Sequence, residues 1–85
     1  MDNIYKPYYI ATADTFQFGS QPTGVLHSIV LGETAAGSIT ISDSKGTIAV
    51  LKASIAENTF TFDVAYTGSL TVVTAGASKL CVIYK

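Results

Sequence analysis

The chain has 85 residues, of which 48% are hydrophobic. Only 13% are charged, whereas an ordinary globular domain has about 25%. One domain fits in this length, which excludes a multidomain enzyme and a polyprotein. Five lysines, no arginine and six acidic residues give a net charge of −1. With no arginine and no lysine cluster, the chain is a poor candidate for binding nucleic acid or an anionic membrane.

Strand patterns follow one another along the chain, with turn signals about every eight to twelve residues. Residues 4–10 are extended, and Pro7 marks them as an edge strand or an arm. Residues 15–18 alternate polar and aromatic side chains, which predicts a second strand. A loop is expected over residues 19–24, followed by a strongly apolar central strand over residues 25–31.

The second half of the chain contains the clearest hairpin signal. Residues 38–42 alternate apolar and polar side chains, and residues 47–53 follow a tight turn. In that turn Asp43 can accept a local backbone hydrogen bond and Gly46 can supply a positive φ. Further turns are expected at residues 57–58, 67–68 and 75–78. They separate three more predicted strands: residues 59–66, 70–74 and 80–84.

These elements predict an all-β fold. We expect a small antiparallel β-sandwich, Ig-like or jelly-roll-like, of about eight short strands in two packed sheets. A closed barrel is the alternative. Residues 1–23 are expected to form an extended N-terminal arm and edge strand, and residues 24–85 the sandwich core. A core this small often needs a further stabiliser, and the single cysteine cannot form an intrachain disulfide. We therefore expect a homo-oligomer.

The chain offers little that could perform catalysis. His27 is the only histidine and Cys81 the only cysteine, so a Cys/His metal site or a nucleophile with its base lacks partners. Residues 76–79 have the wrong spacing for a phosphate-binding loop. We assign no catalytic residue, cofactor or metal, and we expect the protein not to be an enzyme. Three aspartates are attributed to turns and a polar strand face instead of a Ca²⁺ site: Asp14, Asp43 and Asp63.

The N-terminal tyrosines are the candidate interface. Tyr5, Pro7, Tyr8 and Tyr9 either cover one end of the core or form an arm that packs on a neighbouring subunit. A sugar-binding platform is less favoured, because the chain has no tryptophan and no arginine beside these rings. Threonines on the outward strand faces also have two interpretations. They are either solvated β-forming positions or polar subunit contacts.

Five segments occur in an order typical of one protein group. They are GVLHSIVL at residues 24–31, GSITISD at 37–43, GTIA at 46–49, TFTFDV at 59–64 and GSLTVVT at 68–74. In this order the chain resembles small β-sandwich virion structural proteins of tailed bacteriophages, of the capsid decoration or cement type. The resemblance covers about residues 24–85 and carries over no functional residue.

That resemblance implies a function. It implies a non-enzymatic subunit that braces the outer capsid through edge strands and the N-terminal arm. Its partners would be the major capsid protein and further copies of itself, with a trimer favoured. Its location would be the virion surface after synthesis in the host cytoplasm. The alternative is a receptor- or carbohydrate-binding module of a phage tail or fibre.

Overall fold

The fold is built entirely from antiparallel strands. The computed structural model describes residues 5–85, with residues 20–23 described by their backbone alone. The hydrogen-bonded order of the strands is β1-β6-β2-β5-β3-β4. Within residues 5–85, no helix is long and apolar enough to cross a membrane. The strands are β1 (Lys6–Ile10), β2 (Thr15–Glu33), β3 (Ile39–Asp43), β4 (Gly46–Leu51), β5 (Asn58–Thr74) and β6 (Lys79–Tyr84).

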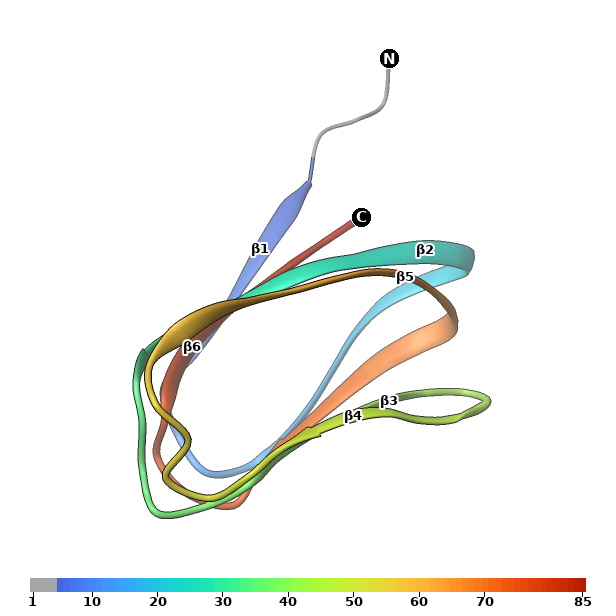
Figure 1. The fold of residues 1–85 in the computed structure, drawn as a ribbon. Helices are drawn as coiled ribbons and strands as arrows, with labels where there is room; N and C mark the ends of the chain where they lie inside the picture. Colours follow the sequence, from blue (N-terminus) through green and yellow to red (C-terminus); the bar gives the residue numbers. More distant parts are fainter. Residues whose placement is uncertain (1–4) are drawn as a thin grey trace.

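Two strands are much longer than the sequence predicts. β2 and β5 pair with each other along their length and bend together, so that both run round the corner at the right of Figure 1. Gly19 and Gly68 adopt positive φ values of 71° and 78° at this bend. Only glycine adopts such angles at little cost, which is why the bend forms there. The expected loop at residues 19–24 and the expected turn at residues 67–68 are therefore two sides of one bent ribbon.

The bend produces two packed layers. The first layer contains β1, β6, residues 24–33 of β2 and residues 58–66 of β5. The second layer contains the remaining ends of β2 and β5 together with β3 and β4. The expected β-sandwich is confirmed. Six strands fill the place of about eight because β2 and β5 each contribute to both layers.

The core lies between the layers and draws on both of them. Inward residues alternate with outward ones, as pleated strands require. In β6, for example, Leu80, Val82 and Tyr84 are buried while Cys81 and Ile83 are partly exposed. From the second layer come Phe18, Ile39, Ile41, Leu51, Leu70 and Val72; from the first come Ile10, Leu26, Ile29, Leu31, Leu80, Val82 and Tyr84.

Tyr66 fills the corner where the two layers join. Its side chain is fully buried and lies against Gly19 and Gly24. A Cβ at Gly24 would come within 2.5 Å of the Tyr66 ring and 2.4 Å of the Lys85 carbonyl oxygen, so no larger residue fits there. Burial, with a smaller contribution from Tyr84, raises the pKa of the Tyr66 hydroxyl above its usual range.

Strand β1, near the start of the described residues, is part of the sandwich. β1 pairs with β6 and lies at the sheet edge, the place in a sheet where proline is tolerated. Ile10 is 1% exposed and belongs to the core. The expected boundary between residues 23 and 24 falls within β2. Residues 1–4 of the expected arm lie outside the described residues.

Candidate functional site

The four residues of the predicted interface do not lie together. Tyr8 points inward, where its ring stacks on Phe18 with 4.1 Å between centroids. Tyr5 stacks on His27 at 4.4 Å. Pro7 and Tyr9 are exposed on β1, with Tyr9 at 64%. Two of the four side chains are thus engaged within the chain, and their use as an interface stays a prediction.

His27 is the centre of a small cluster on the outer side of the first layer. Its Nδ1 donates a hydrogen bond to Asp63 Oδ1, and the Tyr5 ring covers the imidazole. The Lys85 ammonium lies 5.3 Å from the centre of the Tyr5 ring, within cation–π range. Asp63 has a φ of 49° at an irregularity of the β2–β5 pairing, which turns its carboxylate towards His27. The cluster ties the residue before β1 and the residue after β6 to β2 and β5.

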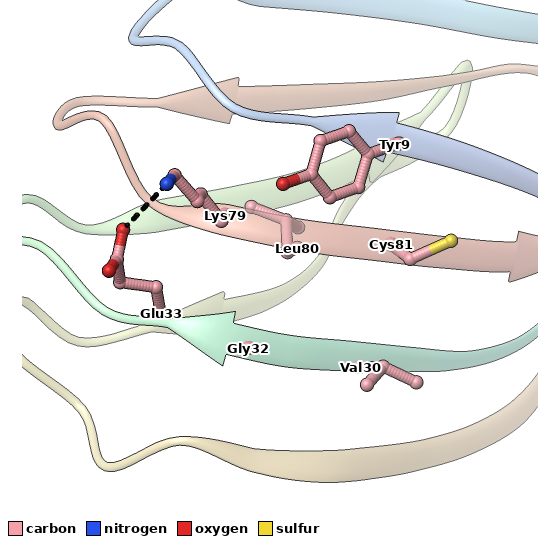
Figure 2. A pocket seen from close by; sticks show the side chains of 7 residues that line it. All are labelled: Tyr9, Val30, Gly32, Glu33, Lys79, Leu80 and Cys81. Carbon is pink, nitrogen blue, oxygen red and sulfur yellow. Dashed lines mark ion pairs between the residues drawn. The ribbon is translucent and has the colours of Figure 1, made fainter.

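A shallow groove crosses the same face further along the strands. It has a volume of about 380 Å³ and lies over β1, β6 and β2 (Figure 2). Tyr9 and Val30 stand on either side, Cys81 lies between them, and Gly32 leaves a notch. An ion pair of 3.3 Å between Lys79 and Glu33 borders one end. The groove lining is mainly apolar, and Cys81 is partly buried as a free thiol. With Tyr5, His27, Asp63 and Lys85, these residues form the tyrosine face.

The outer side of the second layer is different, because none of the eight described residues that strand pairing places there is ionisable. We call it the neutral face. Its residues are half-buried or exposed, while their neighbours along each strand point into the core. Strand pairing places them in two rows that cross all four strands. The rows are Thr15, Val73, Thr40 and Val50, and then Gln17, Thr71, Ser42 and Thr47.

The acidic residues of the described part are held by contacts within the chain. Asp14 accepts a hydrogen bond from the Thr15 amide at 2.7 Å, and Asp63 pairs with His27. Asp43 accepts from the amides of Thr67 at 3.0 Å and Lys45 at 2.9 Å. These three aspartates have separate roles, and residues 5–85 contain no group of three His, Cys, Asp or Glu residues that could hold a metal ion.

Backbone donors also shift two carboxyl pKa values. The amides of Thr67 and Lys45 stabilise the ionised form of Asp43 and lower its pKa. The Thr34 amide, 3.1 Å away, lowers the pKa of Glu57 in the same way. Both carboxylates therefore fasten turns: Asp43 at the β3–β4 hairpin and Glu57 before β5.

The fold has a counterpart among solved structures. The crystal structure of the Drosophila NLP core, described as giving insight into pentamer formation and histone binding, superimposes with a TM-score of 0.67. The match covers 95% of both chains at 19% sequence identity. No family model and no curated protein matches the sequence. At this identity the likeness shows a shared fold.

The resemblance to tailed-phage decoration proteins is therefore wrong. The fold counterpart is the Drosophila NLP core and not a virion protein. The implied capsid function, the receptor-binding alternative and the virion location are not supported and are withdrawn. The major capsid protein partner and the trimer are likewise unsupported. The quoted segments are strand-and-turn patterns, and such patterns recur in any sandwich with similar hairpins.

Sequence reasoning reached some of these features and missed others. Alternation over residues 15–18 and 38–42 predicts that their threonines, Thr15 and Thr40, point outward. Their arrangement as one surface depends on which strands are neighbours, which only the fold shows. The pairing of His27 with Asp63 was missed, because 36 residues separate the two and no local signal connects them.

Proposed function

We propose that the protein is a non-enzymatic structural subunit that works as a homo-oligomer. The observation that carries this proposal is the neutral face, an outer sheet surface with no ionisable side chain among its eight residues. A surface that meets only water usually carries charges for solubility. Burying this one against another protein desolvates no charge, so the main electrostatic cost of association is absent.

The fold counterpart supports an assembly role. The NLP core is described in terms of pentamer formation, and 95% of its length superimposes on this chain. A sandwich of this shape is therefore compatible with closed oligomers. The small size of the domain points the same way, since association adds buried area that a core of 85 residues cannot supply alone.

Histone binding is not carried over to this chain. A chaperone for basic proteins needs an acidic surface, whereas six acidic residues here face five lysines. Glu33 is paired with Lys79, and Glu57 holds the Thr34 amide. Every acidic residue in the described part thus already has a partner within the chain.

The proposal also assigns no catalysis. The His27–Asp63 pair is the one arrangement in the described residues that has the form of a general base with its orienting carboxylate. The Tyr5 ring covers the imidazole, so the pair ties the residue before β1 to β2 and β5 instead of facing a substrate.

Native mass tests the proposed oligomer. We expect light scattering at neutral pH to give a mass several times 8.9 kDa, stable over a tenfold dilution. Native mass spectrometry of the same sample gives the number of copies. A monomer at all concentrations would contradict the proposal.

A further inference from the structure

We propose that two copies of the protein associate by packing their neutral faces against each other. This inference rests on the proposed homo-oligomer and names the surface that forms it. The partner is a second copy of the chain, related by a twofold axis that passes through the neutral face.

The chemistry of the face favours its own copy as a partner. In a twofold contact the same patch meets itself, so every charge would lie near an identical charge. The eight residues of the neutral face avoid this, because none is ionisable. A threonine hydroxyl both donates and accepts hydrogen bonds, so it can pair with the hydroxyl of an identical threonine.

The apolar members of the face give the contact its driving force. Val73 is 38% exposed and Val50 is 58% exposed, and both lie in the row that also contains Thr15 and Thr40. Burying them removes apolar surface from water at about 25 cal/mol per Å². Both side chains already point outward, so a partner can bury them without any change in the core.

The dimensions of the molecule are sufficient for such a contact. Its principal axes measure 37 × 24 × 17 Å. Two sheets pack about 10 Å apart, which fits the shortest axis and leaves the two longer axes to span the sheet faces. A stable interface takes roughly 800 Å² from each partner. Four strands about 4.8 Å apart and two rows about 7 Å apart give the eight residues a few hundred Å², so the contact is centred on the neutral face and also takes in the residues around it.

The opposite side of the molecule is less suited to self-pairing. The tyrosine face carries Lys79, Glu33, His27, Asp63 and Lys85. Each copy would bring these charges against its own charges. Most of them are already held in pairs within the chain, which a new contact would have to disturb.

The test compares two valines of the same strand. Val73→Lys places a charge in the neutral face, where the twofold contact would bring it close to its own copy. The matched control is Val64→Lys. Val64 lies in the first-layer part of β5, at 36% exposure against 38% for Val73. Circular dichroism and thermal unfolding of each variant establish that it folds.

We expect the wild type to contain an even number of copies. The native mass of Val73→Lys should be half that of the wild-type oligomer, and the native mass of Val64→Lys should equal that of the wild type. If Val73→Lys does not fold, Val50→Lys makes the same test at the more exposed edge strand. A wild-type monomer would contradict the proposed homo-oligomer itself, and the neutral-face interface with it.

Other outcomes overturn the interface while leaving the oligomer intact. These are an odd number of copies, an unchanged mass for Val73→Lys, and an equal loss of mass for both lysine variants. Tyr9→Lys tests the remaining possibility, which is association through the tyrosine face. If this variant alone lowers the mass, subunits meet through the tyrosine face, as predicted for Tyr5, Pro7, Tyr8 and Tyr9.

Discussion

The two layers of the sandwich are alike inside and different outside. Both turn Ile, Leu and Val towards one shared core. Outside, the first layer carries aromatic rings and charges that contact one another: Tyr5 on His27, His27 on Asp63 and Lys79 on Glu33. The second layer carries threonine, serine, glutamine and valine with no charge. The outer side of the first layer therefore pairs charged side chains within the chain, whereas the neutral face has no charge to pair.

The inward sides should respond alike to truncation. Ile29 lies in the first layer and Ile41 in the second, and both are fully buried. We expect Ile29→Ala and Ile41→Ala each to lower the free energy of unfolding by about 2–5 kcal/mol, through lost transfer energy and the cavity left behind.

Urea unfolding at one fixed protein concentration measures both variants, because an oligomer's stability depends on concentration. If Ile41→Ala cost less than a third of Ile29→Ala, the idea of one core shared equally by the layers would fail.

The outward sides should respond differently. Asp63 combines a positive φ with a hydrogen bond from His27. Asp63→Ala therefore loses both a residue that tolerates this backbone conformation and the hydrogen bond. We expect a loss of about 1–2 kcal/mol. Asp63→Asn keeps a residue that adopts positive φ readily and should cost less.

The matched variant on the neutral face is Gln17→Ala, at an exposed position of the second layer. It should change stability by no more than about 0.5 kcal/mol. Thermal unfolding of the three variants checks the ranking, and equal losses for Asp63→Ala and Asp63→Asn would remove the backbone argument.

The smallest expected effect concerns pH and the hairpin that ends the neutral face. Amides of Thr67 and Lys45 lower the pKa of Asp43 in the folded protein. Its unfolded value is about 3.9. The stabilisation from Asp43 is therefore fully present above that pH, and it disappears as the pH falls through the lowered folded-state pKa.

Asp43→Asn should accordingly lose less stability between pH 7 and pH 3 than the wild type does. Urea midpoints at the two pH values measure the difference. Glu57→Gln, which removes the other carboxylate with a lowered pKa, should act in the same direction. An identical pH dependence in the wild type and Asp43→Asn would contradict the assigned hydrogen bonds.

The strands could be predicted from the sequence because their signals are local. Alternation at residues 38–42 and the Asp43–Gly46 turn gave the β3–β4 hairpin almost to its ends. Glycines at 19 and 68 correctly marked changes of direction. They did not show that pairing continues between them, where Gln21 lies opposite Gly68. That depends on a partner strand about fifty residues away, and no local pattern encodes it.

The candidate surfaces could be predicted only in part for the same reason. The sequence shows that Tyr5, Tyr8 and Tyr9 have rings suited to contacts. It does not show that Tyr8 stacks on Phe18 and Tyr5 on His27. Outward threonines were recognisable strand by strand. That they form one uncharged surface follows only from the strand order, in which β2, β5, β3 and β4 are neighbours.

The pairing of β1 with β6 has a consequence for how the chain folds during synthesis. Lys6 lies opposite Tyr84 and Ile10 opposite Leu80, so the edge of the first layer joins segments about seventy residues apart. The β3–β4 hairpin can form as soon as residue 51 has left the ribosome, whereas β1 must wait for β6 before its ladder exists. Such non-local closure slows folding. Until then β1 is an unpaired strand with Pro7 near its start, and proline hinders mispairing with other nascent chains.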